Sequence, residues 1–451
     1  MESTQDTGVV MLRETTVKQG KLKGIPGNDP RVTAYKGIPF AAPPTGDLRW
    51  RAPQPPGSWN GIKEAYTFGP ISIQDQPAVG DDLYAREWHV DKDIPMDEDC
   101  LYLNVWTPAL TTEDKLPVLV WYFGGAFQWG YTAEMEFNGE RLARRGIIVV
   151  SVNYRLQVFG FLAHPELTKA QPDSPSNFGL LDQQAGLKWV YENIEAFGGD
   201  PENITIAGQS AGGGSVLNQI CDPDNYPMIK AAAMFSGMIR LNGLRDDILA
   251  PVSLEKAEAK GVEFLDLLGV SSIEEARKLD PIFIRDKYAE YVTSHPRIAP
   301  NMDRVRYKED PYGLFMKDLK ADIPILTGWT NDEFIFDGKN MVESSVRGAV
   351  SAVIDGGSSQ SYYIYRFGAQ MPGYDNPGVF HSSDLWFWFE TLNMCWRPFS
   401  GAHFELARQM CDCFANFVKY HTPNPKDSDP DDPGYWKKAG KGSLNVKEFV
   451  C

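Results

Sequence analysis

A serine flanked by two glycines carries the strongest chemical signal in the sequence. Residues Gly208–Gly212 (GQSAG) fit G-x-S-x-G, the motif that holds a serine nucleophile on a tight turn between a strand and a helix. Such a turn strains the backbone, and a side chain at either glycine would collide with the neighbouring strand or helix. The branched segment 204–206 precedes the motif, and residues 211–219 can continue as a helix. The pattern predicts Ser210 as a nucleophile, the alternative being a glycine-rich turn with an inert serine.

Attack by a serine on a carbonyl group needs hydrogen-bond donors for the negative charge that develops on the carbonyl oxygen. The segment Trp121–Phe127 (WYFGGAF) ends a predicted buried strand in consecutive small residues, which leave backbone N–H groups open to a ligand. We expect the N–H groups of Gly125 and Ala126 to donate to this oxyanion, with the N–H of Ala211 as the third donor. The alternative is a plain glycine loop that binds nothing.

The general base should be a histidine, since triads on this kind of turn follow the chain order serine, acid, histidine. The histidines beyond the motif are His295, His381, His403 and His421. His403 and His421 fall in or at the end of the last predicted helix, where a solvated histidine is expected. His295 precedes a proline and comes before the candidate acids. His381 lies in a polar loop after a predicted strand and is the predicted base.

Two neighbouring carboxylates compete for the role of the acid that orients this histidine. The acid should follow the predicted strand Pro324–Thr327, and the segment Asn331–Glu333 (NDE) stands there. Either Asp332 or Glu333 could orient an imidazole, so their positions alone leave both open.

Short apolar segments alternate with helical patterns along the chain, which is typical of a mostly parallel sheet with helices on both faces. The expected strands are Val118–Phe123, Ile147–Val152, Ile204–Ala207, Ala231–Phe235, Pro324–Thr327 and Tyr362–Phe367. The expected helices are Asp182–Phe197, Leu254–Leu268 and His403–Tyr420. No internal repeat and no linker rich in Gly, Ser or Pro divides the chain. We therefore expect a single α/β domain over residues 1–451.

The composition is that of an ordinary globular protein with a surplus of acidic residues. Of 451 residues, 43% are hydrophobic and 23% are charged, and 60 Asp plus Glu against 44 Lys plus Arg give a net charge of −16. Phosphate backbones and anionic lipids select basic surfaces, so we expect neither nucleic acid nor membrane as a partner. Residues 1–7 lack the basic and apolar regions of a secretory leader, and no apolar run is long enough to span a membrane. For a complete chain, these features predict a cytoplasmic protein.

The cysteines predict free thiols rather than a disulfide framework or a metal site. They are Cys100, Cys221, Cys395, Cys411, Cys413 and Cys451. Cys411 and Cys413 are separated by one residue, whereas the cysteines of zinc sites are separated by about two to four. We expect no metal and no organic cofactor.

Several specific stretches, in one order, resemble the type-B carboxylesterases, the group that includes cholinesterases and bacterial para-nitrobenzyl esterases. These stretches are Tyr35–Pro44 (YKGIPFAAPP), Glu98–Val105 (EDCLYLNV), Gly124–Phe127 (GGAF), Asn153–Leu156 (NYRL), Asn177–Gln183 (NFGLLDQ) and the GQSAG motif. The resemblance runs from about Val10 to Asn424. It implies an α/β-hydrolase fold, ester hydrolysis through an acyl-enzyme, and Glu333 rather than Asp332 as the acid. It likewise implies His381 as the base, through the pattern His-x-x-Asp-Leu.

Three single residues depart from this family pattern. Ser72 stands where the family often has a cysteine, which leaves Cys100 without its usual disulfide partner. Gln209 stands where cholinesterases often have a glutamate. Phe123 begins the oxyanion loop where many members have His or Tyr, and because that side chain is not a donor we expect the chemistry to survive.

The connection from Glu333 to His381 is short for the family. We therefore expect a shortened helical wall near residues 337–360 and a more open pocket. Aromatic residues are plentiful nearby, since Trp386–Phe389 follow the base and Trp329 precedes the acid. We expect some of them to line the pocket and others to lie in the core.

Together these features predict a carboxylic-ester hydrolase with a triad of Ser210, His381 and Glu333 that acts through an acyl-enzyme. The expected substrates are neutral, bulky or aromatic small-molecule esters. One alternative is a catalytically inactive, esterase-like binding module, although such proteins usually lack a triad residue and this chain has all three. The other is an amidase or lactonase of the same fold.

Overall fold

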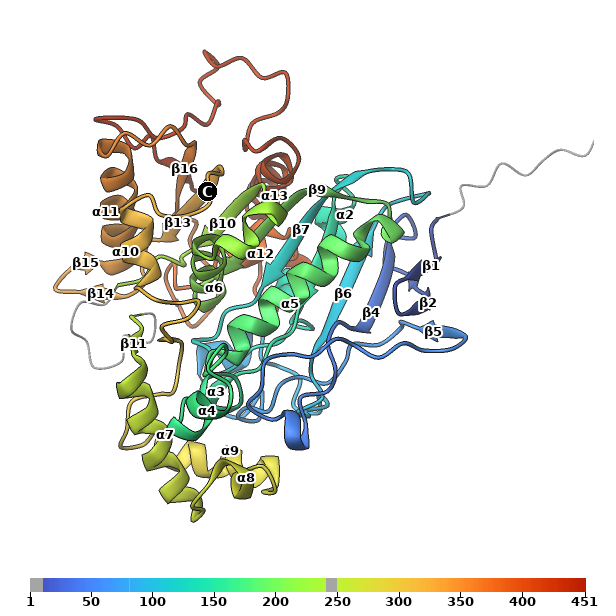
Figure 1. The fold of residues 1–451 in the computed structure, drawn as a ribbon. Coiled ribbons are helices and arrows are strands. Elements are labelled where there is room, and N and C mark those ends of the chain that lie inside the picture. The colour runs from blue at the N-terminus through green and yellow to red at the C-terminus, as the bar shows by residue number, and fades with distance from the viewer. Residues whose placement is uncertain (1–10, 81, 241–249) are drawn as a thin grey trace, which may run out of the picture.

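A ten-stranded sheet forms the centre of the protein, in a computed structural model that describes residues 11–80, 82–240 and 250–451 (Figure 1). From edge to edge, its strands are β17 (Lys447–Phe449), β16 (Tyr362–Phe367), β13 (Ile325–Thr330), β10 (Ala231–Phe235), β9 (Gly199–Gln209), β7 (Leu116–Tyr122), β8 (Ile148–Val152), β6 (Tyr102–Thr107), β4 (Thr33–Pro39) and β3 (Ile25–Pro26). The strands from β17 to β8 pair in parallel, and β6, β4 and β3 complete one edge in antiparallel pairing. The predicted mostly parallel sheet is confirmed.

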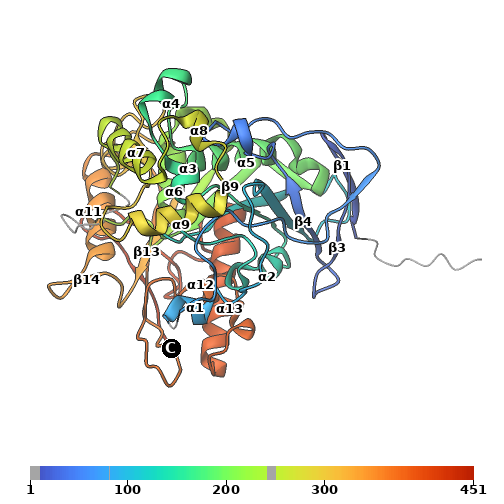
Figure 2. The same cartoon turned by 90° about the horizontal axis from the view of Figure 1, so that it is seen from below.

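Successive side chains of β7 point to opposite faces of the sheet, and both faces are covered by helices. Val118 and Val120 belong to one buried cluster, and Leu119 and Trp121 belong to the other. The helices α5 (Phe178–Asn193), α6 (Ala211–Cys221) and α11 (Met341–Asp355) pack into the first cluster. The helices α2 (Glu140–Ala143), α12 (Leu385–Trp388) and α13 (Gly401–Tyr420) pack into the second. Figure 2 shows α5 and α13 on opposite sides of the strands.

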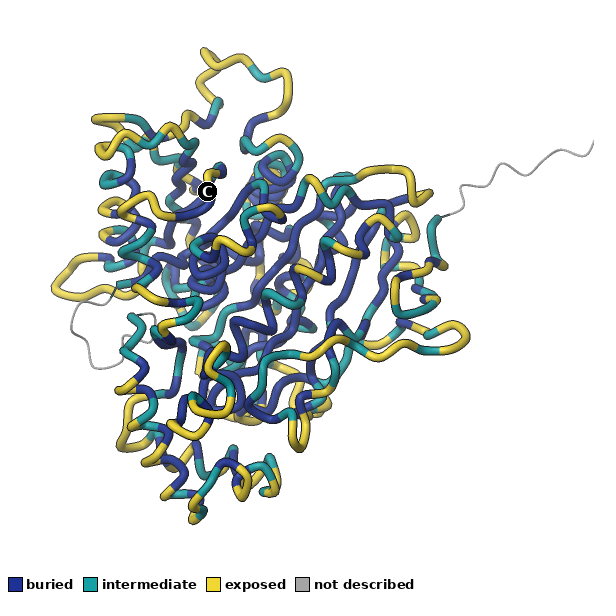
Figure 3. Tube along the Cα trace, in the orientation of Figure 1, coloured by how far each residue is buried: buried dark blue, intermediate teal, exposed yellow. Residues whose placement is uncertain are grey.

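The remaining elements surround this sheet. The short strands are β1 (Glu14–Val17), β2 (Gly20–Lys23), β5 (Ile62–Glu64), β11 (Val252–Ser253), β12 (Asn301–Met302), β14 (Ile335–Phe336) and β15 (Lys339–Asn340). The other α-helices are α1 (Leu83–Glu87), α3 (Gln157–Phe161), α4 (Pro165–Ala170), α7 (Leu254–Leu268), α8 (Ile273–Ala276), α9 (Pro281–Tyr291) and α10 (Pro311–Met316). Figure 3 shows that burial is concentrated in the central strands and the helix faces against them.

The predicted elements match the structure closely, with one informative difference. The predicted strand Tyr362–Phe367 and the predicted helix Leu254–Leu268 have the bounds of β16 and α7. The helix predicted over Asp182–Phe197 instead begins at Phe178 and ends at Asn193, and a 3-10 turn follows it. Residues 178–181, which the prediction left out, are apolar or glycine and are all buried, so this end of α5 has no polar face to mark it in the sequence.

Segment 337–360, where we expect the shortened wall, contains α11. This helix packs on β13 through residues such as Val346, so that part of the segment covers the sheet. Its Asn340 caps the helix, because the side-chain oxygen accepts a hydrogen bond from the N–H of Glu343 at 2.9 Å.

None of the helices within the described ranges combines the length and the apolar character that crossing a lipid bilayer requires. Residues 1–7, which lack the features of a secretory leader in sequence, and Val10, at the start of the family resemblance, lie outside the described residues. All six cysteines have free thiols. Cys100 is buried beside Ser72, whose hydroxyl accepts a hydrogen bond from the Leu156 N–H at 3.1 Å.

Candidate active site

The candidate nucleophile lies on a strained turn between β9 and α6. Ser210 has φ 54° and ψ −123°, a conformation that side-chain-bearing residues rarely adopt. A Cβ at Gly208 would lie 2.4 Å from the carbonyl of Gly212, and one at Gly212 would lie 2.1 Å from the oxygen of Tyr122. Both positions of the GQSAG motif therefore exclude any side chain, for the steric reason expected from the sequence.

The predicted oxyanion loop lies directly against this serine. A Cβ at Gly124 would come within 3.2 Å of the Cβ of Ser210. Gly125 has φ 104° and Ala126 has φ 57°, so the chain turns sharply here. Among the described residues, no acceptor pairs with the N–H of Gly125 or Ala126, and Ala211 stands at the first position of α6, where N–H groups have no partner in the helix. All three line one cavity together with Ser210.

The structure brings Glu333, not Asp332, to His381. The Nδ1 atom of His381 hydrogen-bonds to Oε2 of Glu333, whose side chain is fully buried at the end of β13. The other oxygen of Glu333 accepts hydrogen bonds from the hydroxyl of Ser236 at 2.9 Å and from the N–H of Thr330 at 2.8 Å. These donors hold the carboxylate in one orientation, so it can fix the imidazole tautomer with the proton on Nδ1.

The neighbouring Asp332 binds the backbone of the loop before His381 and does not contact the imidazole. Its Oδ2 atom accepts a hydrogen bond from the N–H of Val379 at 2.7 Å. It thereby anchors the loop that leads to His381, two residues before that histidine. The choice between the two carboxylates, which the sequence spacing left open, depends on these contacts.

Ser210 and His381 line the same cavity, but no hydrogen bond joins them among the described side chains. The Nε2 atom of His381 instead lies 3.3 Å from the side-chain nitrogen of Gln209, which also donates to the hydroxyl of Ser382 at 2.7 Å. Because Nδ1 donates to Glu333, Nε2 is free to accept this bond. Catalytic hydrogen bonds are often long or poorly aligned before substrate binds, so the missing bond between Ser210 and His381 does not exclude the predicted pair.

Replacing Gln209 by glutamate is expected to move the rise of kcat/KM with pH to higher pH, by about one unit or more. A carboxylate beside Nε2 favours the protonated imidazole, which is unable to act as a base. The measurement is a pH profile of kcat/KM on one neutral ester. The matched control is Gln54→Glu, which adds the same charge at an exposed residue. An unchanged profile in Gln209→Glu would argue against His381 as the titrating base.

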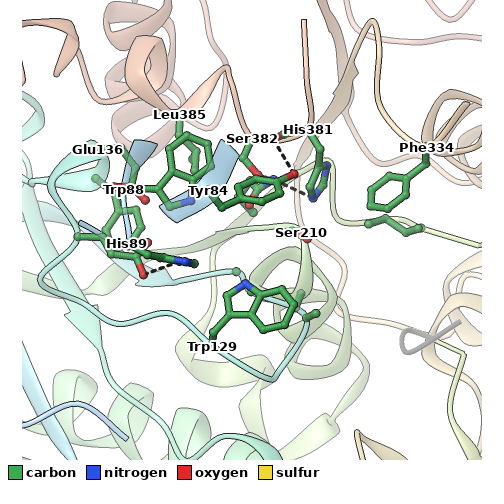
Figure 4. A pocket seen from close by; sticks show the side chains of 18 of the residues that line it. Tyr84, Trp88, His89, Trp129, Glu136, Ser210, Phe334, His381, Ser382 and Leu385 are labelled. Carbon is green, nitrogen blue, oxygen red and sulfur yellow. Dashed lines mark hydrogen bonds and ion pairs between the residues drawn. The ribbon is translucent and has the colours of Figure 1, made fainter. Parts of the chain in front are cut away.

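The cavity over Ser210 has a volume of about 270 Å³ and a largely aromatic wall (Figure 4). Its aromatic residues are Tyr84, Trp88, Trp129, Phe137 and Phe334. The expectation that some of Trp386–Phe389 and Trp329 line the pocket is wrong, because none of them reaches the cavity. Trp388 stacks on Phe235 at 4.9 Å between ring centroids, and Phe389 packs edge-on against Trp121 at 4.8 Å. α12 thus turns these rings toward the sheet.

Residues from distant parts of the chain complete the site. Tyr84 of α1 donates a hydrogen bond from its hydroxyl to the carbonyl of His381 at 3.4 Å. The ring of Phe334 packs edge-on against the imidazole, with 4.7 Å between centroids. Sequence reasoning missed both residues, and it also missed Ser236. Ser236 follows β10 without any motif, and Phe334 is marked only by its place directly after Glu333.

The other histidines beyond the serine have structural contacts. His295 stacks on Tyr291, with 4.3 Å between ring centroids. His403 accepts the N–H of Ser400 and caps the start of α13, and His421 ends the same helix. Within the described residues, no three His, Cys, Asp or Glu side chains are grouped to hold a metal ion.

Comparisons with known proteins agree on one family. The model of the carboxylesterase family matches residues 11–353. Fumonisin B1 esterase of Sphingopyxis macrogoltabida is 34% identical over 318 residues, which cover 70% of this chain and 55% of that protein. Para-nitrobenzyl esterase of Bacillus subtilis (strain 168) is 37% identical over 329 residues, which cover 70% of this chain and 62% of that protein. The aligned part of the chain thus spans somewhat more than half the length of these curated relatives.

Solved structures extend the similarity over nearly the whole chain. A PNB esterase structure has a TM-score of 0.83 and 27% sequence identity, and the match covers 97% of this chain and 96% of that one. A Geobacillus stearothermophilus carboxylesterase has a TM-score of 0.79 and 26% identity, with 97% and 96% covered. The expected α/β-hydrolase fold and the resemblance to type-B carboxylesterases are both confirmed. The chain belongs to the carboxylesterase family.

Proposed function

We propose that the protein hydrolyses small-molecule carboxylic esters, with Ser210 as nucleophile, His381 as general base and Glu333 as the acid. The observation that carries this proposal is the hydrogen bond from His381 to the buried Glu333 in the same cavity as Ser210. We propose the free N–H groups of Gly125, Ala126 and Ala211 as the oxyanion hole. Membership of the carboxylesterase family supports the same activity.

In the proposed reaction, the Oγ atom of Ser210 attacks the ester carbonyl while Nε2 of His381 takes its proton. Glu333 stabilises the resulting imidazolium. The imidazolium then protonates the leaving alcohol, and an acyl-enzyme on Ser210 remains. Water then attacks the acyl-enzyme with its proton passing to His381. The imidazolium returns this proton to Oγ of Ser210 as the bond to the acyl group breaks, so that the carboxylic acid leaves and the free serine is regenerated.

The direct test is hydrolysis of para-nitrophenyl butyrate by the purified protein, beside the matched para-nitroanilide of butyric acid. We expect rapid release of nitrophenol and a far lower kcat/KM for the anilide. A protein inert on every ester of a chromogenic panel would be the inactive binding module instead. A kcat/KM for the anilide equal to that for the ester would identify an amidase.

The protein is expected to be a poor cholinesterase. Gln209 supplies no charge beside the nucleophile, whereas a carboxylate there would favour a cationic substrate by about 1–4 kcal/mol in a partly dry pocket. The measurement compares kcat/KM for butyrylcholine with that for its neutral carbon isostere, 3,3-dimethylbutyl butyrate. We expect no preference for the cation. A preference of about tenfold for butyrylcholine would contradict this prediction.

We also propose that residues 1–451 form one α/β-hydrolase domain whose wall near 337–360 is shortened. An absent wall is unable to clash with a large substrate, so bulky and aromatic esters are expected to be accepted. The measurement is kcat/KM over para-nitrophenyl and naphthyl esters of increasing acyl and alcohol bulk. A steep fall just beyond propionate would show that other residues close the pocket. The aromatic wall of the cavity supports this preference.

A cytoplasmic location is part of the same proposal. It is supported by the buried thiol of Cys100, which faces the hydroxyl of Ser72 rather than a second sulfur atom. Fractionation of the native host, with detection of the untagged protein, tests this location.

A further inference from the structure

A group of ionisable side chains that the proposed mechanism does not use lies in the cavity wall. His89 follows α1, and Glu134 and Glu136 lie at the 3-10 turn Met135–Phe137. Figure 4 shows His89 and Glu136 beside Trp88, on one side of Ser210, whereas Phe334 lies on the other side.

Glu134 and His89 form an ion pair when the imidazole is protonated. Glu134 accepts the N–H of Tyr131 at 2.9 Å, and Nε2 of His89 lies 3.4 Å from the same oxygen. Burial disfavours the protonated imidazole, but the Glu134 carboxylate outweighs it and raises the pKa of His89. The pair is therefore nearly neutral when the imidazole is protonated.

Glu136 has no basic partner. Its residue is 1% exposed, and no N–H group or hydroxyl of the described residues donates to its carboxyl oxygens, although its carboxyl lies within hydrogen-bond reach of the Glu134 carboxyl. Burial is the largest cause that raises the pKa of Glu136 well above its ordinary value, and the charge of Glu134 and the hydrogen bond to it act in the same direction. Glu87 adds to this effect, although Arg397 forms an ion pair with it.

A buried acceptor without a donor is costly, unless a ligand supplies the missing donor. Glu136 lines the cavity that holds Ser210, so a bound ester is the molecule that reaches it. Among the described residues of the cavity wall, no N–H group or hydroxyl donates to these oxygens. Arg297 also lines the cavity, but its guanidinium lies over the Trp129 ring at 5.4 Å.

We propose that Glu136, with Glu134 beside it, binds a hydrogen-bond-donating group, either hydroxyl or primary ammonium, on the part of the ester that extends from Ser210 toward Trp88. This inference rests on the proposed function and names its substrate class as hydroxyalkyl- or aminoalkyl-substituted esters. A quaternary ammonium has no N–H group, so it is unable to donate a hydrogen bond to this carboxyl. A site that hydrogen-bonds a substrate group also discriminates against the analogue that lacks it.

The test uses four phenyl butyrates with one substituent each at the meta position: aminomethyl, hydroxymethyl, ethyl and trimethylammoniomethyl. A second series carries the same groups on the benzoyl part of para-nitrophenyl benzoate, so both halves of the ester are sampled. Each kcat/KM is divided by the rate of alkaline hydrolysis, which removes the electronic effect of the substituent. In one series, we expect the aminomethyl and hydroxymethyl esters to exceed the ethyl ester by about tenfold. The trimethylammonio ester is expected to show no such gain.

Two variants and a control connect this preference to Glu136. In Glu136→Leu, we expect kcat/KM for the donor ester to fall to about that for the ethyl ester. In Glu136→Gln, part of the preference for the donor ester should remain, since the amide oxygen still accepts a hydrogen bond. The control is Glu140→Gln, which alters a second buried glutamate that lies outside this cavity. It should keep the wild-type ratio. Thermal unfolding of each variant confirms that it is folded.

If kcat/KM divided by the rate of alkaline hydrolysis were equal for all four esters in both series of the wild type, the inference would be overturned and the proposed function would be left intact. An equal gain for trimethylammonio and aminomethyl esters would show recognition of charge and would also overturn it. So would a Glu136→Leu variant that is folded and keeps the wild-type ratio. If the wild-type protein hydrolysed none of the esters, that result would contradict the proposed function itself.

Discussion

Replacing Ser210 by alanine is expected to lower kcat by about 10⁴–10⁶, with a residual rate that the oxyanion donors support. The alanine removes the atom that forms the acyl-enzyme, whereas the strained turn keeps its shape because the two glycines still fit their neighbours. The measurement is kcat on one para-nitrophenyl ester, with enzyme concentrations high enough to detect slow turnover.

A matched control for this variant is Ser215→Ala on the same helix. The hydroxyl of Ser215 donates to the carbonyl of Ala211 at 3.0 Å and does not line the cavity. Its loss is expected to change kcat by only a few-fold, since no step of the reaction uses it. If Ser210→Ala kept more than about a tenth of the wild-type kcat, another residue would have to be the nucleophile.

The second large effect is expected from Glu333→Gln, which should lower kcat by about 10⁴. A glutamine offers an N–H group to Nδ1 of His381 and so favours the tautomer with the proton on Nε2. That tautomer is unable to accept the serine proton. The variant also removes the charge that stabilises the imidazolium, while its volume is nearly unchanged.

The neighbouring Asp332→Asn supplies the comparison. Its side-chain oxygen can still accept the Val379 N–H, so kcat is expected to fall by less than about tenfold. Both variants are assayed on the same ester and checked by thermal unfolding. A larger loss of kcat in Asp332→Asn than in Glu333→Gln would show that Asp332, and not Glu333, is the acid.

Much of the fold and the centre of the candidate site could be predicted because their signals are local. The glycines of GQSAG exclude a side chain through backbone atoms a few residues away or on an adjacent strand, and the alternation along β7 repeats every two residues. The bounds of β16 and α7 follow from such periodic patterns. The start of α5 could not be predicted in this way, because a stretch in which every residue is buried shows no alternation of apolar and polar positions.

The pocket wall was predicted poorly because it depends on which way a short helix faces. The aromatic residues of Trp386–Phe389 are next to His381 in sequence, yet they pack on the sheet. The rings that do line the cavity include Tyr84 and Trp88, which are roughly 300 residues away along the chain. No spacing rule joins segments so far apart.

The amino-acid sequence by itself predicted the nucleophile turn and the oxyanion loop, because each depends on backbone sterics within a short segment. It also predicted the parallel sheet, from alternating apolar and helical segments, and the candidate base, from its order in the chain. The spacing of the two carboxylates left the acid open and only the family resemblance favoured Glu333, whereas the tertiary structure shows that Glu333 rather than Asp332 reaches the imidazole and that Gln209 contacts its Nε2. The tertiary structure also placed the carboxyl group of Glu136 in the cavity wall beside Glu134, with no N–H group or hydroxyl of the described residues to donate to it. The physical reason is that hydrogen bonding and the loss of hydration depend on which atoms long-range packing brings together, and short-range sequence patterns do not encode that packing.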